Sequence, residues 1–252
     1  KMCGRKIVWV LHNKGPHRQE HVKQKRFLTR FIARHSDLIL THAREGIGLA
    51  RRYDRRAEAK TCFLHHPTKN RLPKSRPTGP VVYDLLIWGQ ISRYKGVIEY
   101  VRYLRNNPCK GLRVCIVGAC PSQSLAEEIT RELTDTITFI NRSPSFEELA
   151  RYVEQSAFVL EPYNPESVLS SGILMDSLSF GAKVIGPDTG SFKDYAQEKR
   201  LNVYTFRDYR EIDEIVTRYR DCPVSWEGYR DFLEENSWPN FGRRVVELVK
   251  KC

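Results

Sequence analysis

Short apolar runs alternate strictly with amphipathic stretches between residues 81 and 206. The apolar runs are rich in Val, Ile or Phe, as β-strands are, and they cover residues 81–88, 112–118, 137–141, 157–162, 182–186 and 202–206. Helical patterns occupy residues 95–107, 122–134, 145–156, 170–180 and 191–199, and two more at 209–221 and 237–250 close the chain. Because strands that alternate with helices are joined by right-handed crossovers, the sequence predicts an α/β fold with a doubly wound parallel sheet.

The first third of the chain alternates in the same way. Strand patterns at 7–12, 37–41 and 61–65 are separated by a helix at 20–34 and by a second helix that ends near residue 55. Three strands make a thin sheet, so this region is interpreted either as part of a larger α/β domain or as a small module that depends on the other domain. Residues 66–80 hold four prolines without hydrophobic periodicity, which is typical of a linker. We therefore predict two domains, 1–80 with the linker and 81–252.

The net positive charge of the 252-residue chain comes entirely from its first third. Residues 1–80 hold 20 Lys or Arg against 5 Asp or Glu, a formal charge of +15, whereas residues 81–252 hold 22 against 25. Such a charge favours an anionic surface such as the inner leaflet of a membrane. Specific nucleic-acid binding is the weaker alternative, because aromatic residues are not interleaved as in a stacking platform.

The distribution of apolar residues indicates where in the cell the protein is located. No apolar run approaches the roughly 20 residues that span a bilayer, and the basic N-terminal stretch lacks the apolar core of a secretion signal. The seven cysteines include no Cys-x-x-Cys pair, so we expect reduced thiols. The sequence predicts a cytoplasmic protein that is at most peripheral at the inner face of the membrane.

The loop that follows the strand at 81–88 carries two cations at a helix start. Arg93 and Lys95 stand beside Gly96, although a helix N-terminus has a partial positive charge and favours acidic residues. One interpretation is that Ser92 caps the helix and both cations point into water. The other is that an anion binds there, held by N–H groups, by Lys95 and by backbone that Gly96 leaves uncovered.

A second helix start has the same character. Ser171 and Gly172 fall where the helix at 170–180 begins, and Asp176 follows about one turn later. Two helix N-termini that can each bind an anion suggest a diphosphate held between them. The carboxylate of Asp176 suits the vicinal hydroxyls of a ribose. The alternatives are an ordinary serine cap and a solvated acidic residue.

Other polar residues also stand at the ends of predicted strands. Asn141 is a candidate for the wall of a base pocket, and His12 for contact with a sugar hydroxyl or for proton transfer. Both residue types also occur in loops for structural reasons. His17 and His21 are spaced four apart, as a chelating pair on a helix would be, but no third ligand has matching spacing, so no metal is predicted.

Several of these segments together resemble a known family. They are residues 89–96 (GQISRYKG), Val117-Gly118, the stretch from Pro162-Tyr163 to Ser171-Gly172 and residues 181–185 (GAKVI), and, upstream, residues 9–13, 36–40 and 65–67. The pattern is similar to GT-B glycosyltransferases, especially the family-four (group 1) enzymes of the bacterial polysaccharide-building branch. The resemblance spans nearly the whole chain and begins partway through the first of the two GT-B domains.

The resemblance implies a nucleotide diphosphate sugar as donor substrate, no cofactor, and a sugar or lipid-linked acceptor. It assigns donor binding to Gly89, Arg93, Lys95, Asn141, Ser171, Gly172 and Asp176. It places Lys95 on the diphosphate and Asp176 on the ribose. His12 is the first catalytic candidate. The paired glutamates of the family align with Val168 and Asp176, so the neighbouring Glu166 is the second catalytic candidate.

The implied activity is transfer of a sugar to an acceptor hydroxyl in polysaccharide or glycolipid synthesis. Two alternatives stay open at this stage. A nucleotide-sugar epimerase on the same fold would turn over the donor without an acceptor, and a truncated, non-catalytic relative would only bind the nucleotide.

Overall fold

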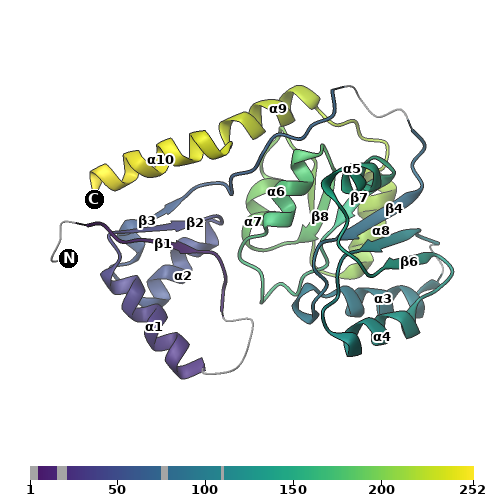
Figure 1. The fold of residues 1–252 in the computed structure, drawn as a ribbon, viewed down its shortest axis with the longest axis horizontal. Coiled ribbons are helices and arrows are strands. Elements are labelled where there is room, and N and C mark those ends of the chain that lie inside the picture. Colours follow the sequence, from purple (N-terminus) through teal and green to yellow (C-terminus); the bar gives the residue numbers. More distant parts are fainter. Residues whose placement is uncertain (1–4, 16–21, 75–78, 109–110) are drawn as a thin grey trace.

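The structure is a computed structural model that describes residues 5–15, 22–74, 79–108 and 111–252. Figure 1 shows two α/β units side by side, with the last helix extending from the second unit over the first. Each unit is built on its own parallel sheet, of three strands in the first unit and six in the second.

The first unit places three parallel strands beside two helices. Its strands are β1 (Val8–Leu11), β2 (Leu38–Thr41) and β3 (Thr61–Phe63), and its helices are α1 (Val22–His35) and α2 (Glu45–Tyr53), followed by the short 3-10 turn η1 (Glu58–Lys60). Thr41 is in register with Leu11 on one side and with Phe63 on the other. The residues that follow these three strands therefore emerge at one edge of the sheet.

The second unit contains the doubly wound sheet that the alternating pattern predicts. Its strands are β4 (Tyr83–Trp88), β5 (Val114–Val117), β6 (Ile137–Ile140), β7 (Ser156–Leu160), β8 (Val184–Pro187) and β9 (Val203–Phe206). They pair in parallel in the order β6-β5-β4-β7-β8-β9. The winding direction reverses between β4 and β7, and in such sheets ligands bind in the crevice beyond this reversal. The predicted fold class is confirmed.

Helices cover both faces of this sheet, because successive strand residues point to opposite sides. Leu85 and Ile87 of β4 pack into a core with α3 (Val97–Asn106), α4 (Gln123–Glu132) and α8 (Tyr209–Tyr219). Leu86 packs into a second core with α5 (Phe146–Glu154), α6 (Gly172–Ser179), α7 (Gly190–Ala196) and α9 (Trp226–Glu235). The strands are consequently mostly apolar, as buried parallel strands are.

Most element boundaries match the expectation from sequence to within two residues. The exception is α9, which the sequence analysis missed. Its inward residues Tyr229, Phe232 and Leu233 do have helical spacing, but Gly228 in its first turn weakens the pattern. In the described part of the chain, no helix has the length and apolar character needed to cross a membrane.

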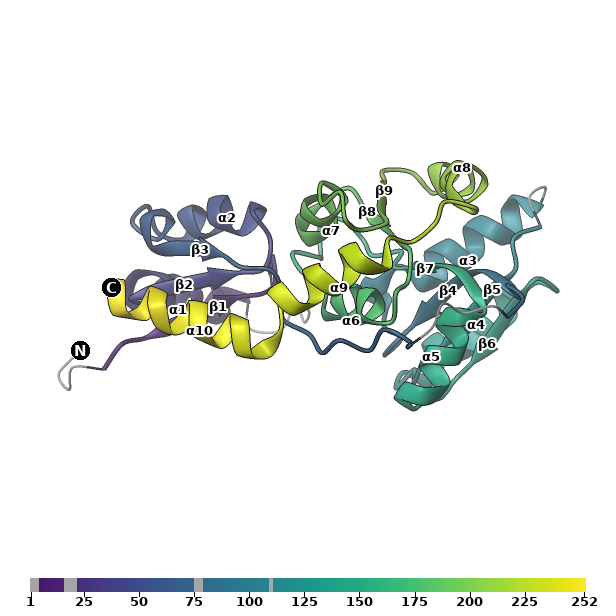
Figure 2. The ribbon, with the colours of Figure 1, turned by 90° about the horizontal axis from the view of Figure 1, so that it is seen from above.

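Several contacts join the two units. The last helix, α10 (Trp238–Lys251), leaves the second unit and runs along the first (Figure 2). The ring of Phe241 on this helix lies 5.8 Å from that of His42 in the first unit. Thr68 in the connecting segment forms a bridge with Ser237. Lys14, on the loop after β1, lies 2.8 Å from Glu45 of α2 and donates a 2.7 Å hydrogen bond to Thr189 before α7.

Candidate functional site

A cavity of about 470 Å³ opens at the reversal point of the six-stranded sheet. Three loops form its wall, one after β4, one after β7 and one after β1 of the other unit. Their lining residues include Trp88, Gly89, Gln90, Tyr94 and Lys95, then Tyr163, Ser167, Val168, Ser170, Ser171, Gly172, Ile173 and Asp176, and finally His12 and Asn13. The cavity is thus built where the topology predicts ligand binding, and both units contribute to it.

The loop after β4 depends on two glycines with positive φ. A Cβ at Gly89 (φ +91°) would lie 2.5 Å from Ile173 and 3.3 Å from Nζ of Lys95. A Cβ at Gly96 (φ +70°) would overlap the carbonyl oxygen of Pro162 at 1.9 Å. Gly96 therefore serves close contact between two loops, which corrects the expectation that it leaves backbone open to an anion.

The position of Lys95 distinguishes the two interpretations of this loop, cations that point into water or a site for an anion. Its side chain is buried, with 7% of the residue exposed, and it lines the cavity. Within the described residues its ammonium group has no ion pair, and it lies 5.7 Å from the ring of Tyr163. Burial lowers the pKa of Lys95, and the nearby Glu161 opposes this shift. A buried cation without a paired anion is costly, so this position suits an anionic ligand.

Glu161 directly follows β7 and interacts with two residues that line the cavity, Ser171 and Lys95. Its Oε2 accepts a 2.6 Å hydrogen bond from Ser171, whereas Oε1 has no hydrogen-bond partner among the described residues. Burial raises the pKa of Glu161 to about 7, although the Ser171 hydrogen bond and the charge of Lys95 act in the opposite direction. The sequence analysis gave this residue no role.

The start of α6 forms the opposite wall. Ser171 caps the helix, because its Oγ accepts a 3.3 Å hydrogen bond from the N–H of Leu174. The first N–H groups of a helix have no acceptor within it and favour an anion. Gly172 faces the first unit, since a Cβ placed there would lie 3.8 Å from Nε2 of His66.

Asp176 lines the cavity one turn further along α6, and it also holds the connecting segment. Its Oδ1 accepts a 2.8 Å hydrogen bond from Thr68 and lies 3.1 Å from the guanidinium of Arg71. The sequence did not predict these partners, which are more than 100 residues away in the chain.

His12, in the loop after β1, is a residue of the first unit that lines the cavity. Its Nδ1 lies 2.8 Å from Oγ of Ser170, and the same hydroxyl lies 3.1 Å from the main-chain oxygen of His12. The loop after β1 is therefore fixed to the loop after β7, on which the cap of α6 stands.

No family model matches the sequence, and neither does any curated protein. Several solved structures, however, are similar to the structure of this chain. HepE from Anabaena in complex with UDP-glucose has a TM-score of 0.73 at 14% identity, covering 98% of this chain and 73% of HepE. TarM has a TM-score of 0.69 at 10% identity, covering 97% of this chain and 50% of its own. A trehalose-phosphate synthase from Burkholderia vietnamiensis has a TM-score of 0.68 at 13% identity. This match covers 98% of this chain and 67% of the synthase.

This chain has the GT-B fold. The cavity lies between the two sheets, with His12 contributed by the first unit and Lys95 by the second.

The GT-B cleft contains six of the nine site residues predicted from sequence. They are His12, Gly89, Lys95, Ser171, Gly172 and Asp176. The other three lie elsewhere. Arg93 is exposed and donates a 2.6 Å hydrogen bond to Glu128, as the solvent interpretation of the loop expects. Asn141 accepts a 2.8 Å hydrogen bond from the N–H of Cys120 beside a different cavity, and Glu166 lines a third with Lys14.

Glu161 gives the cleft a testable pH dependence. Burial raises the pKa of the Glu161 carboxyl from its ordinary value of 4.5 to about 7 in the folded chain. Its contribution to stability is therefore complete below pH 4.5 and is lost as the pH rises through about 7. We expect the melting temperature of Glu161→Gln, relative to that of the wild type, to rise between pH 4.5 and 7. Thermal melts of both proteins across this interval test the expectation, and a constant difference would contradict it.

Proposed function

We propose that this protein is a GT-B glycosyltransferase of the family-four type, which moves a sugar from a nucleotide diphosphate sugar to an acceptor hydroxyl. The buried ammonium of Lys95 carries this proposal, because it lines the cleft opposite the start of α6 without an ion pair among the described residues. A diphosphate between them would be bound by a full charge on one side and by N–H groups on the other.

The same arrangement accounts for catalysis. Departure of the diphosphate concentrates negative charge on its oxygens, and groups already fixed around those oxygens stabilise this charge without reorganising. Lys95 and the first N–H groups of α6 supply that stabilisation. His12, held by Ser170, stands on the opposite half of the cleft, where an acceptor must approach the sugar.

A second cavity, of about 610 Å³, supports an acceptor site in the first unit. It shares His12 and Asn13 with the donor cleft. Its lining combines apolar residues with cations, including Trp9, Leu28, Ile32, Leu49, Tyr53, Lys14, Lys25, Arg26 and Arg52. That chemistry suits an acceptor with an apolar part beside a phosphate, such as a lipid-linked sugar.

Ligand binding by the pure protein is the direct test. HepE has been solved with UDP-glucose, with UDP and with UDP plus glucose, so UDP compounds are the first candidates here. UDP, GDP and their sugars at millimolar concentration should raise the melting temperature in at least one case, because a ligand that binds only the folded state stabilises it. A panel without any shift would contradict the donor site.

Product analysis separates the remaining alternatives. A glycosyltransferase releases nucleoside diphosphate in proportion to the acceptor supplied. An epimerase converts the donor without an acceptor, and a non-catalytic module binds the nucleotide without turnover.

Asp176 provides a further prediction. Asp176→Asn should weaken UDP binding about tenfold through loss of a charged hydrogen bond to ribose, while leaving pyrophosphate binding unchanged. Because this variant also loses the ion pair with Arg71, Arg71→Gln is the matched control, which keeps the carboxylate. Calorimetry with both ligands tests this. Equal losses in the two variants would mean that Asp176 acts by anchoring the connecting segment.

A further inference from the structure

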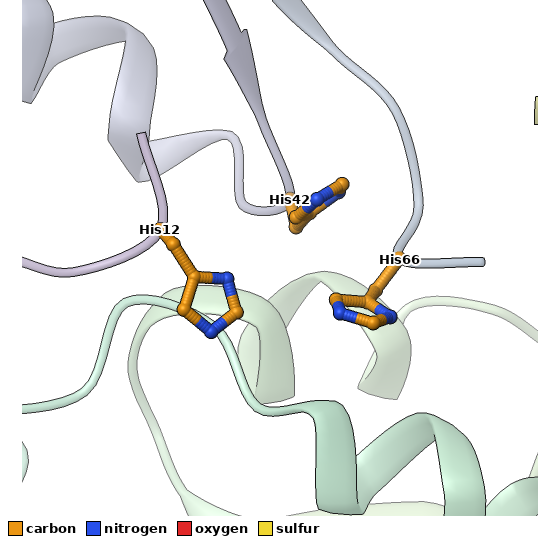
Figure 3. A group of neighbouring side chains, drawn as sticks. All are labelled: His12, His42 and His66. Carbon is orange, nitrogen blue, oxygen red and sulfur yellow. The ribbon is translucent and has the colours of Figure 1, made fainter. Parts of the chain in front are cut away.

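Three histidines meet where the first unit borders the donor cleft. His12 and His42 directly follow β1 and β2, and His66 lies on the segment after β3. Since these parallel strands are neighbours and in register, their following residues emerge together. Figure 3 shows the three side chains extending from separate segments into one region. The ring centroids are 6.1 Å (His12–His42), 5.9 Å (His12–His66) and 4.8 Å (His42–His66) apart.

We propose that His12, His42 and His66 bind a divalent transition-metal ion, with zinc as the best match. One ring nitrogen from each histidine lies within 4.8 Å of the other two. A tetrahedral zinc ion with Zn–N bonds of about 2.0–2.1 Å holds its nitrogens about 3.3 Å apart. Metal binding therefore requires the side chains to rotate so that the three nitrogens come closer together.

Hydrogen bonds prepare two of the rings for such a role. Nδ1 of His42 lies 2.9 Å from the carbonyl oxygen of Leu64, and Nδ1 of His66 lies 2.9 Å from that of Pro67. A carbonyl oxygen can only accept, so each Nδ1 is the donor and Nε2 of the neutral ring carries the lone pair. Metal-binding histidines are usually oriented in this way, through a carbonyl or carboxylate on the other nitrogen.

The chemistry of the three side chains also limits which ion can bind. His12 is fixed by Ser170. A cluster of three imidazoles is a nitrogen donor set that zinc accepts and that calcium and magnesium, which prefer oxygen, do not.

The position of the cluster indicates what the ion would do. Three protein ligands leave a fourth position of a tetrahedral ion for water or a substrate oxygen. His12 lines the donor cleft, and Nε2 of His66 lies against Gly172 at the start of α6. If the donor site is as proposed, a dication here should raise the affinity for nucleoside diphosphate. Metal binding itself does not depend on that function.

Metal binding by the chelator-treated full chain tests the proposal. Zinc titration against a chromophoric chelator should give one tight equivalent, and cobalt should give visible absorption of tetrahedral intensity. His12→Gln and His66→Gln should each weaken zinc binding at least about 100-fold, because mutations of outer-shell partners alone already cost 10–100-fold. His42→Gln belongs to the series, but its buried side chain risks misfolding, so the other two variants decide.

Two controls address histidines outside the cluster. His35→Gln removes an exposed histidine of α1, and a His17→Gln/His21→Gln variant removes the pair spaced four apart, which lies outside the described residues. Both should bind zinc like the wild type. The proposal is overturned if the wild type binds no zinc, if His12→Gln and His66→Gln bind as tightly as the wild type, or if the paired variant abolishes binding. In these cases the three rings only pack together.

Discussion

Replacing Lys95 with Ala will weaken binding of nucleoside diphosphate by about 30- to 100-fold, the cost of a lost hydrogen bond between charged groups. The side chain is buried and lines the cleft, so water does not replace it as it would at the surface. Binding of the nucleoside without phosphates should change little. Calorimetry with UDP and uridine, or with GDP and guanosine, measures both effects.

Arg93→Ala is the matched control for Lys95→Ala. It removes a positive charge from the same short segment, but from an exposed side chain that is bonded to Glu128 outside the cleft. We expect a loss of less than about threefold, since exposed charges are screened by solvent and salt. Equal losses for Arg93→Ala and Lys95→Ala would reduce the effect to general electrostatics. Equal losses for nucleoside and diphosphate in Lys95→Ala would mean that Lys95 supports the fold.

The contrast between Lys95 and Arg93 also shows which features of the site can be predicted from sequence and which cannot. Both stand in the same loop with the same partial charge of a helix start, and local pattern alone cannot separate them. What separates them is tertiary: Lys95 is covered by the loop after β7, whereas Arg93 meets Glu128 of α4. The alternation of strands and helices, by contrast, is a local signal, and it predicted the sheet and therefore the edge at which the cleft lies.

Other parts of the site could be predicted only if the order and register of the strands were known. The three histidines are separated by 30 and 24 residues, so no motif spacing connects them. Each does stand at or just after the end of a predicted strand, and the order of those strands would have placed them together. The expectation of no metal considered only the pair at 17 and 21. Similarly, the anchor of Asp176 to Thr68 and Arg71 depends on the path of the connecting segment over α6.

The first unit should bind vesicles of anionic lipid at low salt and release them steeply as salt rises. Its charge of +15 is the motivation from sequence, and each Lys or Arg near such a surface contributes about 1 kcal/mol that salt screens. The structure adds an apolar component on α1, where Phe27, Leu28 and Phe31 are 73%, 55% and 51% exposed. Arg26, Arg30 and Arg34 lie on the same helix at intervals of four. A helix with both features suits the membrane interface.

A Phe27→Ser/Phe31→Ser variant separates this interaction from general attraction between charges. Its charge is unchanged, yet burial of two phenylalanine side chains is lost, so vesicle binding should fall at least about tenfold. Val246→Ser, which changes an exposed apolar residue of α10, should bind like the wild type. Duplex DNA is the competing anion. If DNA displaces the protein from vesicles at low micromolar concentration whatever its sequence, and the double variant binds vesicles like the wild type, α1 is only a nonspecific cationic surface. The lipid-linked acceptor would then rest on the apolar and basic cavity beside His12 alone, and a soluble anionic acceptor would become the better candidate for that cavity.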